Sequence, residues 1–160
     1  MNILAQRGKT LKSLILNEAN IRSIGLSYLW IAFSDINDDL KLDALSVRGN
    51  NIGLEWAKRL NSKLSSPLKV KSLDLGDNCL NDPGSKYLAT YFSDNTHIES
   101  LDFSCNCLTK DGLRSLKELI WLNGGLKELI VKGNEDIDQS VEMCERRMRV
   151  SETKQKIIYY

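Results

Sequence analysis

The 160-residue chain has few of the residues from which metal sites are built. His97 is its single histidine, and its four cysteines include no Cys-x-x-Cys pair. Zinc sites usually combine paired cysteines and histidines at short spacing, so the composition argues against a metal centre. Cys79 and Cys107 lie 28 residues apart at equivalent repeat positions, close enough for a disulfide in principle, but we expect reduced thiols.

Neither sign of charge dominates the chain, since 22 Lys and Arg face 21 Asp and Glu for a net charge of +1. This balance argues against nucleic-acid binding driven by bulk charge. Apolar runs are much shorter than the ~20 residues of a membrane span, and residues 1–8 lack the apolar stretch of a signal peptide. We therefore expect an intracellular protein, in the cytoplasm or an organelle, with no cofactor.

The chain does contain a phrase that recurs at a fixed spacing. Its copies begin at Leu11, Leu42, Val70, Ile98 and Leu126, so the steps are 31, 28, 28 and 28 residues. A fixed period in this range indicates a solenoid of stacked units.

Each copy follows the template Leu-x-x-Leu-x-Leu-x-x-Asn-x-Leu, with other apolar residues allowed at the Leu positions. This template resembles the leucine-rich repeat, and the 28-residue period is similar to that of the ribonuclease-inhibitor-like subtype. Template positions four and six are two residues apart, so each pair points to one face of a short strand. We expect these pairs in the core: Leu14 and Leu16, Leu45 and Val47, Leu73 and Leu75, Leu101 and Phe103, and Leu129 and Val131.

The second half of each repeat has helical spacing, because apolar residues recur eight and twelve positions after the template. These are Leu29, Leu60, Leu88 and Leu116, followed by Phe33, Leu64, Phe92 and Ile120. Strands pair at ~4.8 Å whereas helices need ~8–10 Å, so the stack should curve with its strands inside. The predicted fold is an α/β solenoid of about five repeats, with a short parallel sheet on the concave side and helices on the convex side.

An asparagine occupies the ninth template position in four copies, and Ala19 replaces it in the first. A buried turn leaves backbone donors and acceptors without partners, and an inward-pointing amide can satisfy both kinds. The sequence therefore predicts a structural ladder formed by Asn50, Asn78, Asn106 and Asn134.

The repeat pattern sets the expected organisation of the chain. The solenoid covers residues 1–136, and residues 1–10 match the end of a preceding repeat's helix. Ile137, Val141, Cys144 and Met148 then recur at helical spacing, which predicts a capping helix over residues 137–150. The apolar end of the 151–160 tail suggests a peptide that docks elsewhere through Ile157, Ile158, Tyr159 and Tyr160.

The concave face is where a binding site is expected, because alternate strand side chains project from it. Asp74 and Asp102 occupy the same template position on adjacent strands, so their carboxylates are expected ~5 Å apart. An open sheet has no cleft to exclude water, so we interpret them as a recognition patch and predict no catalytic residues. The candidate protein-binding residues are Asn17, Ser46, Arg48, Ser72, Asp74, Ser100, Asp102, Glu128, Ile130 and Lys132.

The concave face offers only ~300 Å², well below the ~800 Å² that each partner contributes to a standard interface. The leading hypothesis is therefore a non-enzymatic interaction module within a larger assembly, which binds proteins through this face and its open ends. Two alternatives follow from the resemblance alone. One is a regulator resembling the leucine-rich GTPase activators of the Ran system, and the other is a ligase or innate-sensor adaptor.

Overall fold

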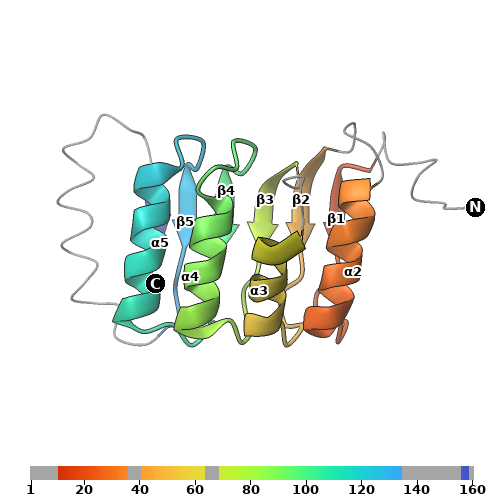
Figure 1. The fold of residues 1–160 in the computed structure, drawn as a ribbon, viewed down its shortest axis with the longest axis horizontal. Coiled ribbons are helices and arrows are strands. Elements are labelled where there is room, and N and C mark those ends of the chain that lie inside the picture. Colours follow the sequence, from red (N-terminus) through yellow and green to blue (C-terminus); the bar gives the residue numbers. More distant parts are fainter. Residues whose placement is uncertain (1–10, 36–40, 64–68, 135–155, 159–160) are drawn as a thin grey trace, which may run out of the picture.

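The computed structural model describes residues 11–35, 41–63, 69–134 and 156–158. Within them, strands and helices alternate along the chain, and the helices lie in a row in front of one sheet (Figure 1). The strands are β1 (Ser13–Ile15), β2 (Leu42–Ser46), β3 (Val70–Asp74), β4 (Ser100–Asp102), β5 (Glu128–Ile130) and β6 (Lys156–Ile158). The helices are α2 (Arg22–Asp35), α3 (Leu54–Lys63), α4 (Asn81–Phe92) and α5 (Lys110–Leu122).

The sheet is parallel throughout and its strands follow the order of the chain. The register places each template position beside the same position of the next repeat, as when Leu45 pairs with Leu73 and Leu73 with Leu101. Such pairing stacks equivalent side chains in rows, which is the physical basis of a repeat solenoid. The predicted α/β solenoid with a parallel sheet is confirmed.

The core lies between the sheet and the helices. Leu45, Leu73 and Leu101 are at most 1% exposed, and the helical residues Leu60, Leu88 and Leu116 are buried behind them. In the first repeat Leu14 and Leu16 are only partly buried, since β1 is the edge strand among the described residues. Leu64, predicted to lie in the core, is outside the described residues.

The asparagines of the ninth template position form a ladder of hydrogen bonds between repeats. Asn78 Oδ1 accepts from the backbone N–H groups of Asn50 and Ile52, at 3.0 and 2.9 Å. Its Nδ2 donates to the carbonyls of Leu75 and Gly76, both at 2.9 Å. Asn50, Asn106 and Asn134 repeat this arrangement in their own turns.

Trp56 replaces the glycine that the other repeats carry at its position, and it packs into an aromatic cluster. Its ring lies 5.4 Å from that of Trp30 in an edge-to-face arrangement. Trp30 in turn packs edge-to-face on Tyr91 and Phe92 of α4, with ring centroids 6.1 and 6.5 Å away. The cluster therefore joins helices of three successive repeats.

The end of the chain contributes a strand to the chain's own sheet. β6 pairs in parallel with β5, with Ile157 beside Leu129 and Ile158 beside Ile130. This corrects the expectation that the last residues leave the body to dock elsewhere, because the edge of β5 offers backbone groups for Ile157 and Ile158 to pair with. Tyr159, Tyr160, residues 1–10 and the predicted capping helix 137–150 lie outside the described residues.

No helix among the described residues has the length and apolar character needed to cross a membrane.

Candidate protein-binding face

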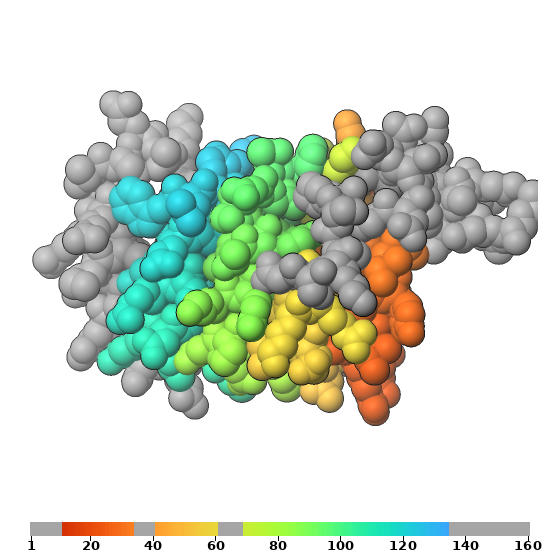
Figure 2. Space-filling view, viewed as in Figure 1, coloured from red at the N-terminus to blue at the C-terminus, as the bar shows by residue number. Residues whose placement is uncertain are grey.

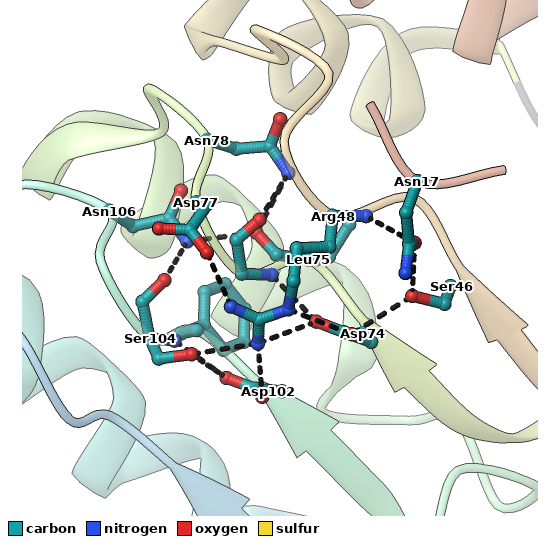
Figure 3. Close-up of polar contacts among 12 residues, drawn as sticks. Asn17, Ser46, Arg48, Asp74, Leu75, Asp77, Asn78, Asp102, Ser104 and Asn106 are labelled. Atoms are coloured by element: carbon teal, nitrogen blue, oxygen red, sulfur yellow. Dashed lines mark hydrogen bonds and ion pairs between the residues drawn. The ribbon is translucent and has the colours of Figure 1, made fainter. Parts of the chain in front are cut away.

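Arg48 is the centre of the concave face. It follows β2, and its side chain reaches across two neighbouring repeats (Figure 3). Nε donates to Asp74 Oδ2 at 3.2 Å, and Nη1 donates to Asp77 Oδ2 at 2.6 Å. Nη2 donates to Asp102 Oδ2 at 2.7 Å and to Ser104 Oγ at 3.0 Å. One guanidinium therefore links three carboxylates and a hydroxyl, and we call these five residues the Arg48 cluster.

The carboxylates of the cluster are also fixed by backbone and hydroxyl donors. Asp74 Oδ1 accepts from the N–H of Gly76 at 2.9 Å. Asp102 Oδ1 accepts from the N–H of Ser104 at 2.7 Å and from its hydroxyl at 2.5 Å. Both aspartates thus occupy defined orientations before any partner arrives.

Gly76 makes room for the guanidinium. A Cβ atom at this position would collide with the Arg48 head group, while the other repeats have a side chain in the same row. A long side chain after β2 and no side chain at the equivalent position after β3 together let the Arg48 head group reach Asp102. Only a glycine permits this path without displacing the guanidinium.

The surroundings of Arg48 favour its charged form. Burial alone would lower the pKa of the guanidinium, but the hydrogen bonds to Asp77 and Asp74 and the charges of Asp74 and Asp102 outweigh it, so the pKa lies above its ordinary value. The cluster holds one positive and three negative side chains, so the concave face carries an excess of negative charge around Arg48.

The expected Asp74–Asp102 patch needs a correction. The two residues do pair across β3 and β4, but both bind the same guanidinium instead of facing each other as an open carboxylate pair. Their side chains are 27% and 15% exposed, and that of Arg48 is 27% exposed. The charged residues thus form a partly buried network.

Two more predicted residues continue this network towards β1. Asn17 Oδ1 accepts from the N–H of Arg48 at 3.1 Å and lies 2.6 Å from Ser46 Oγ. Ser46 Oγ also lies 2.9 Å from Asp74 Oδ2, so its single proton serves one acceptor at a time.

The remaining predicted residues are distributed over β3 to β5 and the turn after β5. Ser100 Oγ donates to Glu128 Oε2 at 3.0 Å, which links β4 to β5. Ser72 and Ile130 are partly exposed, and Lys132 is exposed. These residues share the face with the Arg48 cluster, but their side chains form no hydrogen bond or ion pair with it in the described part of the chain.

Comparison with known proteins identifies the architecture. Residues 67–89 and 94–117 match the family model "Leucine Rich repeat". The fold is a leucine-rich repeat solenoid. Among solved structures, that of "Leiomodin-1 Actin-Binding Site 2 (ABS2)" resembles this chain with a TM-score of 0.59 at 16% sequence identity, over 100% of this chain and 80% of that one. A search of curated proteins returned no match.

Two residues of this face, Gly76 and Asp77, were not predicted from the sequence. Asp77 lies in a turn just beyond β3, with a positive φ of 49°, so strand alternation does not predict its direction. A detectable signal was the coincidence of an arginine in one repeat with a glycine at the same template position of the next.

A second missed feature is a row of alternating charge at template position two. Lys71 pairs with Asp43 at 2.7 Å, and Lys127 pairs with Glu99 at 2.8 Å. The hydrogen bond from Lys71 holds the pKa of Asp43 below its ordinary value, and that from Lys127 does the same for Glu99. Because these ion pairs are exposed, they contribute little to stability. Their main effect is on which charges lie side by side on neighbouring strands.

Cys105 lies beside the Arg48 cluster and is exposed. Burial, followed by a hydrogen bond to Asp77, raises the pKa of Cys105 above its ordinary value.

Replacing Arg48 with methionine tests the cluster. The variant keeps most of the side-chain length but leaves three carboxylates without their shared cation, so we expect the free energy of unfolding to fall by about 1–3 kcal/mol. Urea denaturation at neutral pH measures the change. Arg114→Met is the control, because that arginine is 72% exposed and has one ion pair at 3.5 Å. Equal stability of the two variants would contradict the assigned role of Arg48.

Proposed function

We propose that this chain is a non-enzymatic protein-protein interaction module, acting as a subunit or scaffold within an intracellular assembly. The observation that supports the proposal best is the Arg48 cluster, which fixes polar groups from three repeats on the exposed face of the sheet. A surface whose side chains are already ordered loses less conformational entropy when a partner binds.

The chemistry of the face favours recognition over reaction. Its carboxylates are bound to a guanidinium, to backbone N–H groups and to hydroxyl groups, which is suited to presenting a fixed pattern of charge. Because the face is small, we propose that the ends of the solenoid add contact area. We also assign the repeats to the ribonuclease-inhibitor-like subtype, since successive strands pair at offsets of 28 residues and alternate with helices.

Charge reversal of an exposed concave residue tests the proposal. Lys132 is exposed and takes part in no ion pair with the other residues that the structure describes, so Lys132→Glu should change recognition with little effect on folding. The tagged full chain is used to capture partners from its native cells, and the recovered proteins are quantified by mass spectrometry. We expect recovery of the main partner to fall about tenfold, which corresponds to ~1.4 kcal/mol of binding free energy.

Lys86→Glu is the matched control, because Lys86 is an exposed lysine on α4, on the opposite side of the molecule. It should leave recovery unchanged. Equal losses with both variants would indicate a nonspecific charge effect, and no loss with Lys132→Glu would argue against this part of the concave face. Purified actin is included as one defined probe, because the similar solved structure is that of an actin-binding site.

A further inference from the structure

β6 is joined to the sheet differently from the strands before it. It has three residues, Lys156–Ile158, and one neighbour, β5, whereas β2 to β5 each pair on both sides. Each ladder asparagine reinforces a strand pair by accepting from backbone N–H groups of the preceding repeat, and Asn134 does so for the fourth repeat. Among the described residues, β6 is therefore linked to β5 by strand pairing and contributes no residue to the ladder.

The short pairing of β6 favours exchange with another extended segment. β5 and β6 have three residues each, whereas β2 and β3 have five. A terminal strand that pairs on one side opens locally at a free energy well below that of global unfolding. When β6 opens, the backbone N–H and C=O groups along β5 are able to bind a strand from elsewhere.

The residues of β5 define which strand its edge accepts. Leu129 is 2% exposed and lies beside Ile157, so the strand that covers this edge needs an apolar residue there. The next pair in register consists of two isoleucines. Glu128 lies beside Lys156, and an opposite charge on a neighbouring strand is favourable. The register therefore selects a parallel strand that reads basic residue, β-branched residue, β-branched residue.

The other sides of the sheet are less suited to an added strand. Helices cover one face of it, and Figure 2 shows α2 to α5 side by side over that face. At the β1 edge the ladder residue is missing. Asn50 accepts from N–H groups of the repeat before it, and Ala19 at the same template position has no side-chain oxygen to do so for a strand before β1. The β5 edge is thus the better acceptor.

We propose that the β5 edge is the docking site for an extended segment of the partner protein, and that β6 occupies this site while the partner is absent. The docked segment pairs in parallel with Glu128–Ile130 and carries the same pattern of residue types as β6. This inference rests on the proposed function, because it requires a protein partner. Since β6 belongs to the same chain, it competes at high effective concentration and lowers the affinity for the partner.

Two variants of the full chain release β6 from the edge. In this sheet the N–H groups of template position three donate to the preceding strand, as Glu128 does to Glu99, and position five points the same way. Ile158 occupies position five, so Ile158→Pro removes a donor from the pairing with β5. Ile157→Asp is the second variant, because it places a charge beside the buried Leu129.

A synthetic peptide with the sequence of residues 154–160 is the probe, and fluorescence anisotropy measures its binding. We expect it to bind both variants at least about tenfold more tightly than the original chain, in which β6 competes. The same peptide with Ile158→Pro should not bind, and with Lys156→Glu it should bind about threefold more weakly because of Glu128. Circular dichroism verifies that each variant is folded. Failure of the unmodified peptide to bind either folded variant would overturn the proposal.

Capture from native cells then connects the edge to the partner. Ile158→Pro should raise recovery of the main partner at least about threefold, and excess peptide should remove that gain. Unchanged or lower recovery would overturn the assignment to a partner, as would a dimer of the original chain that Ile158→Pro abolishes, since that result indicates strand exchange between copies. Peptide binding without any recovered partner would count against the proposed function. Recovery that depends on Lys132 without peptide binding would count against this site alone.

Discussion

Replacing Asn78 with alanine is expected to lower the free energy of unfolding by about 3–4 kcal/mol. The side chain is 3% exposed and bonds to backbone groups of two repeats. Without it, the N–H groups of Asn50 and Ile52 lose their acceptor, and the carbonyls of Leu75 and Gly76 lose a donor. Each buried group left without a partner costs roughly 1–3 kcal/mol, and local relaxation recovers part of the sum.

Asn134→Ala provides the graded comparison for this effect. Asn134 accepts from the N–H groups of Asn106 and Leu108, as Asn78 does from Asn50 and Ile52, but it is only partly buried. Water can replace part of what is lost there, so the penalty should be less than half as large. Chemical denaturation followed by circular dichroism measures both variants. Equal losses would show that burial does not set the strength of the ladder.

The solenoid and the asparagine ladder could be predicted because the residues that form them recur along the chain at a fixed spacing. Apolar residues such as Leu73 and Leu75 recur at the same two template positions in all five copies. Each copy therefore supports the assignment made for the other four. The core of the second to fifth repeats followed from this rule alone. The partial burial of Leu14 and Leu16 did not, because it depends on what lies beside the first strand.

The Arg48 cluster could be predicted only in part, for a different physical reason. Strand alternation places Arg48, Asp74 and Asp102 on one face, and that much is visible in the sequence. The contacts among these three residues depend on how far the flexible Arg48 side chain reaches across neighbouring strands. Neither the repeat period nor the repeat template determines that reach. The hydrogen bond from Arg48 to Asp102 joins residues 54 positions apart. The pairing of β6 with β5 was missed because Lys154 stands where the next copy of the template would begin with an apolar residue, although Ile157 lies 28 residues after Leu129 and so at template position four.

Trp30→Ala is expected to destabilise the fold by about 3–5 kcal/mol. Trp30 is completely buried and packs edge-to-face on Trp56, Tyr91 and Phe92. It also donates a hydrogen bond from Nε1 to the Tyr91 hydroxyl at 3.3 Å. Removing the indole opens a cavity at the point where α2, α3 and α4 meet, so the contacts of three repeats weaken together. Because neighbouring repeats stabilise one another, we expect the unfolding transition to broaden as well as to shift.

Trp121→Ala is the control for this prediction, since the same side chain is removed at a position that is 62% exposed. It should change the free energy of unfolding by less than about 0.5 kcal/mol. Urea denaturation is followed by circular dichroism, because both variants alter tryptophan fluorescence directly. Trp30→Phe should recover much of the loss by keeping an aromatic ring in the cluster. If Trp30→Ala cost no more than Trp121→Ala, the aromatic cluster would not be what holds the first three helices together.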